Sequence, residues 1–170
     1  SRYMNRLQEI NDEGSWARME PGLVCGGLNR ALMRSGKFFP PDPSTSDYCT
    51  LGGMLGNNSS GAHSVKYGNT IDYVRSLEVV LSNGSRWSIA REEGSGDGVE
   101  EENEIYGELK RLIQDNKEII AANYPDLPKN CSGYPLDRVE EGGRFNLARL
   151  LIGSEGTLGF ITSATLRVID

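Results

Sequence analysis

Three prolines within four positions, Pro40, Pro41 and Pro43, constrain this chain more than any other local feature. A proline fixes φ, removes a backbone N–H and turns the preceding residue away from helical angles. The segment from Phe38 to Pro43 must therefore follow a rigid, extended path. Small polar residues follow it from Ser44 to Gly61, in a composition too organised for a simple linker.

Hydrophobic periodicity predicts the elements on either side of this segment. Alternation over residues 14–21 indicates a strand that ends in a turn, and helical spacing over residues 23–34 predicts a helix that stops at Gly36. Residues 74–81 form an apolar strand, and the turn at Asn83 and Gly84 makes a hairpin with residues 86–89.

The second half of the chain is expected to add two helices and one strand. An acidic, glycine-rich stretch at residues 92–103 predicts a solvated loop, and the next helix, over residues 105–120, should direct its isoleucines and leucines into the core. A short helix over residues 146–152 and an alternating strand over residues 160–168 complete the set. The order lacks regular strand–helix–strand alternation, which favours an α+β fold with a mainly antiparallel sheet flanked by helices.

Charge and cysteine content limit the partners of the chain. The net charge of −6 disfavours nucleic acid and anionic membranes, so a bound phosphate must be held by local dipoles rather than by a basic surface. The sequence shows no apolar run long enough to span a bilayer and no signal-peptide pattern. Three cysteines without C-x-x-C spacing indicate reduced structural thiols and a cytoplasmic protein.

Several chemistries are excluded by missing residues. No glycine-rich dinucleotide fingerprint follows a strand, and the two glycines at 56 and 61 have Walker spacing without the following lysine and hydroxyl residue. His63 is the only histidine, so a multi-histidine metal site cannot form, and no metal is expected. A nucleophile would have to use His63 as its base, and nothing in the sequence orients that side chain.

Small residues remain as candidates for ligand binding. Glycines let a backbone approach a ligand, and successive amides in tight turns bind oxyanions without a formal positive charge. Hydroxyls and side-chain amides nearby add donors. For any single loop, turn glycines without a ligand are the simpler explanation, but two loops, one preceded by the proline segment, favour binding. The glycines concerned are Gly52, Gly53, Gly61, Gly153, Gly156 and Gly159.

An ordered set of motifs resembles the FAD-linked oxidases that share the PCMH-type, or vanillyl-alcohol-oxidase-like, FAD-binding domain. The most similar members are D-lactate, glycolate and D-2-hydroxyglutarate dehydrogenases, some of them fused to iron–sulfur modules. The resemblance spans nearly the whole chain and is more specific than any one motif. It rests on Pro40–Ser44, Thr50–Gly53, Asn57–Gly61, Lys66–Gly68, Leu77–Leu81 and Gly153–Gly159.

This resemblance implies that the parent protein oxidises a small D-2-hydroxy acid by hydride transfer to FAD. It also implies that residues 1–170 are one partial FAD-binding domain. The family's first phosphate loop has no counterpart here, its substrate-binding cap would lie beyond Asp170, and the fragment alone should be inactive. A non-catalytic nucleotide- or anion-binding module is the alternative, and a structural domain whose glycines serve only turns is the third reading.

Cofactor contacts also follow from the resemblance. It places Pro41, Asp42 and a turn at Thr50–Gly53 along the cofactor and Asn57–Gly61 at the pyrophosphate and flavin. Glu155 would accept from a ribose hydroxyl or hold backbone amides. The full expected set is Pro41, Asp42, Thr50, Leu51, Gly52, Gly53, Asn57, Asn58, Ser59, Ser60, Gly61, Glu155, Gly156, Gly159, Phe160 and Ile161, with no catalytic residue.

For three further residues and one loop, contact with a ligand is weighed against a structural role. His63 is more easily a loop histidine than a ligand contact, Lys66 a surface lysine, and Tyr67 a core aromatic. The loop at residues 129–134 resembles a stretch of the same dehydrogenases and is expected equally on the ligand side or on the surface.

Overall fold

The fold is built on a five-stranded antiparallel sheet with the order β1-β2-β7-β3-β4. A computed structural model describes residues 2–90, 104–125, 127, 130–141 and 144–170. Every neighbouring pair of strands is antiparallel, which confirms the α+β class. The strands are β1 (Leu7–Ile10), β2 (Trp16–Met19), β7 (Phe160–Arg167), β3 (Val74–Val80) and β4 (Arg86–Ala90).

The last strand, β7, lies in the centre of the sheet between β2 and β3. Strand β7 therefore joins the N-terminal strands β1 and β2 to the β3–β4 hairpin. Gly84, with φ +81°, forms the turn of that hairpin, as the sequence predicts.

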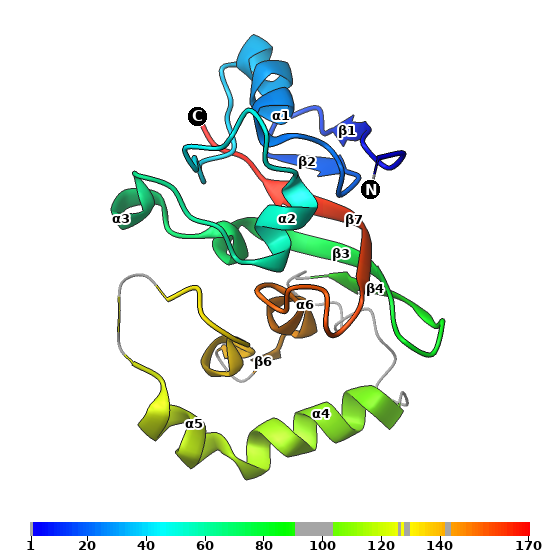
Figure 1. Ribbon diagram of the computed structural model, residues 1–170, viewed down its shortest axis with the longest axis vertical. Coiled ribbons are helices and arrows are strands. Elements are labelled where there is room, and N and C mark those ends of the chain that lie inside the picture. Colours follow the sequence, from blue (N-terminus) through cyan, green and yellow to red (C-terminus); the bar gives the residue numbers. More distant parts are fainter. Residues whose placement is uncertain (1, 91–103, 126, 128–129, 142–143) are drawn as a thin grey trace.

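Helices cover one face of the sheet. Helices α2 (Leu51–Gly56) and α6 (Leu147–Leu151) lie in front of it in Figure 1, and α6 contacts β3 and β4. Helix α1 (Cys25–Leu32) continues as the short 3₁₀ helix η1 (Met33–Ser35), which ends at Gly36 with φ +71°. The core between helices and sheet includes Ala17, Met19, Leu28, Leu32, Phe39, Leu55, Leu77, Ile89, Leu150 and Leu166.

The single helix expected over residues 105–120 is two helices, α4 (Glu104–Asp115) and α5 (Lys117–Asn123), separated at Asn116. Asn116 has φ −109° and ψ 12°, which interrupts the helical path. Ile113 is buried, but Leu112 is 60% exposed and Ile119 is 62% exposed. The expectation that this whole apolar face lies in the core is therefore wrong. The solvated loop expected at residues 92–103 lies outside the described residues.

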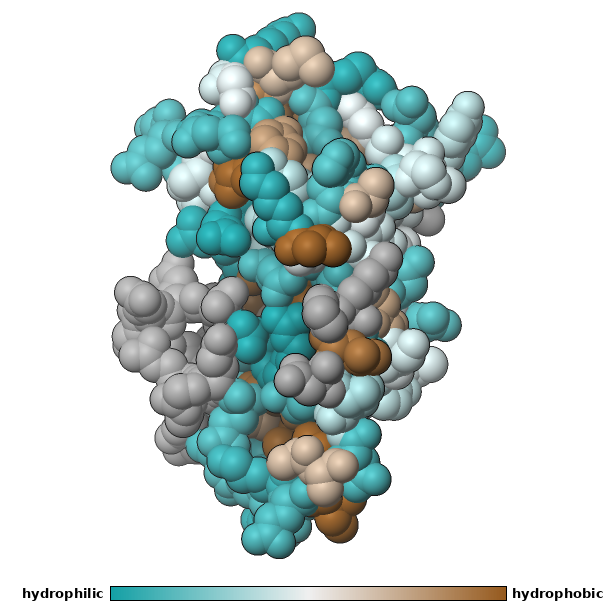
Figure 2. Space-filling model, turned by 90° about the vertical axis from the view of Figure 1, so that its left-hand side faces the viewer, coloured by the Kyte–Doolittle hydropathy of each residue, from teal (hydrophilic) through white to brown (hydrophobic). Residues whose placement is uncertain are grey.

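Short elements connect these larger ones. They are α3 (Ser64–Tyr67), η2 (Thr70–Tyr73), η3 (Leu136–Arg138) and the ribbon of β5 (Glu140–Glu141) and β6 (Arg144–Phe145). Figure 2 shows the face on which α3 lies, where hydrophilic residues predominate and apolar ones are scattered. Among the described helices, none has the length and apolar character needed to cross a membrane.

Candidate cofactor site

The first glycine segment starts a helix instead of forming the expected turn. Thr50 is the N-cap of α2, and its Oγ1 accepts a hydrogen bond from the Gly53 N–H at 3.2 Å. The apolar residues Leu51, Met54 and Leu55 follow at i, i+3 and i+4, and all three are buried. This spacing was the signal that could have predicted α2.

Burial explains why a glycine-rich segment becomes helical. Each of the three glycines in α2 costs about 1 kcal/mol relative to alanine. Burying each of the three apolar side chains contributes about 1.5–3 kcal/mol. Tertiary packing therefore outweighs the local propensity, and Leu51 belongs to the core rather than to a ligand-facing turn.

Gly52 is required because α2 begins directly against the end of β2. The Gly52 N–H donates to the Pro21 carbonyl at 2.7 Å. A Cβ at this position would lie 2.6 Å from Pro21 Cβ and 2.8 Å from the Pro21 carbonyl oxygen. Only glycine permits this approach.

The second glycine loop docks onto the end of α2. Gly153, Glu155 and Gly156 have φ values of +85°, +51° and +80°, which turn the chain sharply. The Gly153 N–H donates to the Leu55 carbonyl at 2.9 Å, and the Glu155 N–H donates to the Gly56 carbonyl at 2.8 Å. Two segments about a hundred residues apart in the sequence thus meet.

A cleft of about 390 Å³ lies where these two segments meet. Nine of the expected cofactor residues line it: Thr50, Gly52, Gly53, Asn57, Glu155, Gly156, Gly159, Phe160 and Ile161. Four residues that were not among the expected cofactor contacts also line it: Pro21, Gly56, Leu151 and Ser154. The lining excludes Pro41, Asp42, Leu51, Asn58, Ser59, Ser60 and Gly61.

The glycines of the cleft leave space for a ligand. A Cβ at Gly156 would meet nothing within 4 Å, one at Gly53 would meet only Thr50 Oγ1 at 3.3 Å, and one at Gly56 only the Glu155 backbone at 3.9 Å. Side chains at these positions would therefore project into the cleft. Phe160, 55% exposed, adds an aromatic surface to its lining. A cradle of this kind fits a flat nucleotide group.

The Glu155 side chain forms no hydrogen bond or ion pair within the described part of the chain. It therefore does not hold backbone amides here, one of the two roles expected for it. Its carboxylate remains able to accept a hydrogen bond from a ligand hydroxyl, the other expected role.

Amides in the segment Asn57–Gly61 are mostly used within the protein. The N–H groups of Asn57, Asn58 and Ser59 donate to the carbonyls of Gly53, Leu55 and Met54, respectively. An anion-binding concavity made of these three successive amides, as the glycine pattern suggested, is therefore not formed. A cofactor contact in this segment must use side chains or the backbone of Ser60 and Gly61.

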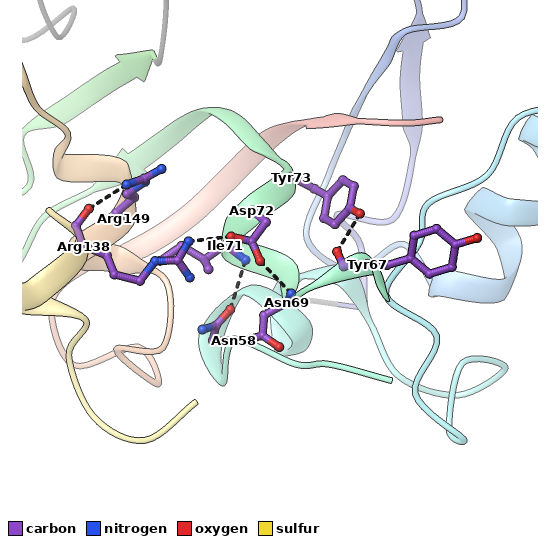
Figure 3. Close-up of polar contacts among 8 residues, drawn as sticks. All are labelled: Asn58, Tyr67, Asn69, Ile71, Asp72, Tyr73, Arg138 and Arg149. Atoms are coloured by element: carbon purple, nitrogen blue, oxygen red, sulfur yellow. Dashed lines mark hydrogen bonds and ion pairs between the residues drawn. The ribbon is translucent and has the colours of Figure 1, made fainter. Parts of the chain in front are cut away.

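Asn58 has a structural position. It is buried with φ +48°, and its Oδ1 accepts a hydrogen bond from the Ile71 N–H at 3.0 Å (Figure 3). This contact fixes the segment after α2 onto η2.

The proline segment meets the chain after Gly61 through one carboxylate. Asp42 Oδ2 lies 2.5 Å from His63 Nδ1, and the His63 N–H points to Asp42 Oδ1 at 3.5 Å. A Cβ at Gly61 would lie 2.0 Å from Asp42 Oδ1 and 2.5 Å from its backbone carbonyl. We call Asp42, Gly61 and His63 the clamp. Both side chains are exposed, and the imidazole that the sequence left without an orienting group has one.

Pro41, beside the clamp, contacts the core. Its carbonyl oxygen lies 3.9 Å from Cys25 Sγ, which donates to it. Burial, with smaller contributions from Cys49 and Asp42, raises the pKa of the Cys25 thiol to about 12. Cys25 therefore stays protonated, and it is a free thiol, as are Cys49 and Cys131.

Tyr67 lies at the edge of the core rather than inside it. Its ring packs edge-on against Phe38, with centroids 5.8 Å apart, and Lys66 Nζ lies 4.7 Å from the ring centroid. The Tyr73 hydroxyl donates to the Tyr67 carbonyl at 2.6 Å, as Figure 3 shows. The Phe38 contact holds α3 to the proline segment, and the Tyr73 hydrogen bond holds it to η2.

The described part of the loop at residues 129–134 packs against the second glycine loop. The Gly133 carbonyl oxygen would lie 3.2 Å from a Cβ at Gly153, and Tyr134 Oη lies 2.8 Å from Thr157 Oγ1. These contacts place the described part of the loop against the segment that forms one wall of the cleft, outside the cleft lining. Tyr134 itself does not line the cleft.

A polar network that the sequence did not predict joins η2 to η3 and to α6. Arg138 pairs with Asp72 Oδ1 at 2.5 Å, and Asp72 Oδ2 accepts from the Asn69 N–H at 2.7 Å (Figure 3). Arg149 donates to the Arg138 carbonyl at 2.9 Å. The ion pair joins residues 66 positions apart, which no local pattern reveals. Within the described ranges, no group of three or more His, Cys, Asp and Glu side chains could hold a metal ion.

Residues 1–90 match a family described as "FAD binding domain". The match covers more than half of the chain. The chain belongs to this family of FAD-binding domains. FAD is therefore its cofactor, and the fit of the cleft to a nucleotide agrees with this assignment.

Curated relatives of this FAD-binding domain include dehydrogenases and an oxidase subunit. D-2-hydroxyglutarate dehydrogenase of Escherichia coli (strain K12) is 38% identical over 175 residues, covering 99% of this chain and 17% of the relative. Glycolate oxidase subunit GlcD of Bacillus subtilis (strain 168) is 33% identical, covering 99% and 26%. D-lactate dehydrogenase of Archaeoglobus fulgidus is 31% identical, covering 94% and 26%. The chain thus spans about a sixth to a quarter of the length of these relatives.

Solved structures show the same fold. Alkyldihydroxyacetonephosphate synthase superposes with a TM-score of 0.61 at 23% identity, over 100% of this chain and 22% of that one. This likeness supports the architecture of the FAD-binding domain.

Proposed function

We propose that the parent protein is a flavin-dependent oxidoreductase that oxidises a D-2-hydroxy acid of the lactate, glycolate or 2-hydroxyglutarate type. Residues 1–170 would form part of its FAD-binding domain. The observation that carries this proposal is the similarity over 99% of the chain to a D-2-hydroxyglutarate dehydrogenase and to a glycolate oxidase subunit. When bound, FAD supplies the acceptor for a hydride from the carbon that bears the hydroxyl group.

The cleft is the part of the chain proposed to hold the adenosine end of FAD. Gly156, Gly159, Phe160 and Ile161 would contact it, and Glu155 would accept a hydrogen bond from a ribose hydroxyl. The open space at Gly53 and Gly156 supports this assignment.

The clamp and the residues next to it are proposed to face the pyrophosphate and the flavin of FAD. Pro41, Asp42 and the stretch from Asn57 to Gly61 would flank the pyrophosphate and flavin. Since the amides of Asn57–Ser59 are already bonded, this side would act through Ser60, Gly61 and side chains. These residues would orient the cofactor and exclude water, and no residue of this chain is assigned a proton transfer.

A cytoplasmic location and a further iron–sulfur module of the parent belong to the same proposal. The free thiols of Cys25, Cys49 and Cys131 support a reducing compartment. The iron–sulfur module rests on the resemblance to the larger dehydrogenases.

The test uses the full-length parent with Gly53→Leu. The leucine side chain would enter the cleft, so we expect FAD affinity to fall at least tenfold while the cofactor-free protein keeps its melting temperature within a few degrees. FAD titration followed by flavin fluorescence measures the first effect, and circular dichroism the second. Gly107→Leu on α4 is the matched control, because a Cβ there meets nothing within 4 Å and the site lies outside the cleft.

Bleaching of the oxidised flavin absorbance by D-lactate, glycolate or D-2-hydroxyglutarate under anaerobic conditions tests the reaction. FAD binding without bleaching by any of them would favour a non-catalytic nucleotide-binding module. If Gly53→Leu lowers the stability of the fold but FAD has no effect on either protein, the result would favour a structural domain whose glycines serve only turns.

A further inference from the structure

The open face of the sheet carries a second hollow that the cofactor site does not use. It has a volume of about 320 Å³ and lies over β2, β7, β3 and β4. Small side chains form its floor, and the larger Trp16, Arg18, Arg75 and Glu78 stand around them. None of its lining residues lines the cleft.

A β-bulge directs one arginine into this hollow. Val74 pairs with Leu166 and Ser76 with Thr165, so β3 advances two residues where β7 advances one, and Arg75 is the extra residue. As a result, Arg75 and Ser76 both line the hollow. Bulges of this kind commonly re-aim a side chain beside a functional site.

Thr165 lies at the centre of the floor. Its partner on β2 is Arg18 and its partner on β3 is Ser76, so an arginine stands on one side and the Arg75 bulge on the other. Thr165 is only 7% exposed, and its hydroxyl forms no hydrogen bond with any described residue. This hydroxyl is therefore able to bond to a ligand that enters the hollow.

The charged side chains around the hollow differ in whether another side chain of the protein bonds to them. Arg18 lies 3.9 Å from Glu9 and 5.8 Å from the Trp16 ring centroid, and Glu78 accepts a hydrogen bond from Ser88 at 2.7 Å. Arg75 has no ion pair or hydrogen bond within the described ranges. The exposed Arg75 guanidinium and the Thr165 hydroxyl lie on adjacent strands and are thus both available to a ligand in the hollow, in a chain whose net charge is −6.

We propose that this hollow binds the carboxylate group of a small organic acid. Arg75 would hold the carboxylate through paired N–H groups, the Thr165 hydroxyl would donate to it, and Trp16 would contact a short apolar chain. Glu78 disfavours a second negative charge on the ligand, which favours a carboxylate over a phosphate dianion. The site is independent of FAD and of the proposed reaction.

Saturation-transfer NMR with butyrate on the FAD-loaded parent tests the site, because it detects weak binding to large proteins. We expect a dissociation constant on the order of 1 mM and weaker competition by inorganic phosphate than by acetate. Arg75→Gln should weaken binding about tenfold or more, and Thr165→Val about threefold.

Arg86→Gln is the matched control, since it removes the same charge from the neighbouring strand β4 outside the hollow. It should leave butyrate binding unchanged, and all three variants should keep FAD affinity and melting temperature. The proposal is wrong if butyrate does not bind, or if Arg75→Gln and Arg86→Gln have equal effects. The latter result would place any bound butyrate elsewhere, such as the hydroxy-acid site.

Discussion

The cleft and the clamp are built by opposite means. In the cleft, side chains are absent where a ligand would lie, and glycines at Gly53, Gly56 and Gly156 leave the space open. In the clamp, a carboxylate and an imidazole bond to each other at 2.5 Å, and the glycine between them is needed for their close approach. The absence of a side chain at glycine therefore leaves space for a ligand in the cleft, and in the clamp it lets two chain segments approach each other.

The regions also differ in what holds them. The cleft walls rest on buried apolar residues of α2 and on backbone hydrogen bonds from the second glycine loop. The clamp lies on exposed loops, so its surroundings can move. Changes at the cleft should therefore cost more stability than changes at the clamp, and the following measurements test that order.

The largest effect is expected for Gly52→Ala. Its Cβ would lie 2.6 Å from Pro21 Cβ and 2.8 Å from the Pro21 carbonyl, and both the start of α2 and the end of β2 would have to shift. We expect a loss of about 3 kcal/mol in the free energy of unfolding, measured by urea denaturation. Gly53→Ala is the control and should change the free energy of unfolding by less than about 1 kcal/mol, because the higher helix propensity of alanine offsets its 3.3 Å contact with Thr50 Oγ1.

Gly61→Ala should follow, with a loss of about 1–2 kcal/mol. Its Cβ would overlap both the side chain and the backbone of Asp42, but the exposed loops can separate. The same urea denaturation measures it. A loss larger than that of Gly52→Ala would show that the clamp, not the cleft, is the more rigid region.

Thr50→Ala removes the N-cap of α2, where Oγ1 accepts from the Gly53 N–H. Caps of this kind contribute about 1 kcal/mol, and thermal unfolding should show this loss. Thr50→Ser keeps the acceptor and should restore most of the stability. If serine behaves like alanine, the methyl group rather than the cap supports the helix start.

The smallest effect is expected from the Asp42–His63 pair. Its side chains are 40% and 66% exposed, so a double-mutant cycle of Asp42→Asn and His63→Ala should give a coupling free energy of about 0.5 kcal/mol. Thermal unfolding at two salt concentrations measures it, and salt should reduce it. A coupling above about 2 kcal/mol would contradict the view that the clamp is solvated.

Local chemistry determined much of this protein. The apolar run at residues 74–81 and the Asn83–Gly84 turn give the β3–β4 hairpin, because hydrophobic pattern and turn geometry are properties of neighbouring residues. Gly36 likewise ends the helical path that begins with α1. The α+β class follows from the order of such elements.

Tertiary structure decided how the predicted cofactor residues are distributed. Residues that are close in sequence can lie in different places. Asn57 lines the cleft, whereas Asn58 is buried and bonds to the Ile71 N–H. Helix α2 exists because packing outweighs its glycines, and the Arg138–Asp72 pair joins distant segments. Sequence composition identified the residue types that a nucleotide site needs. Which of them face the same space depended on long-range packing, and only the folded chain fixes that.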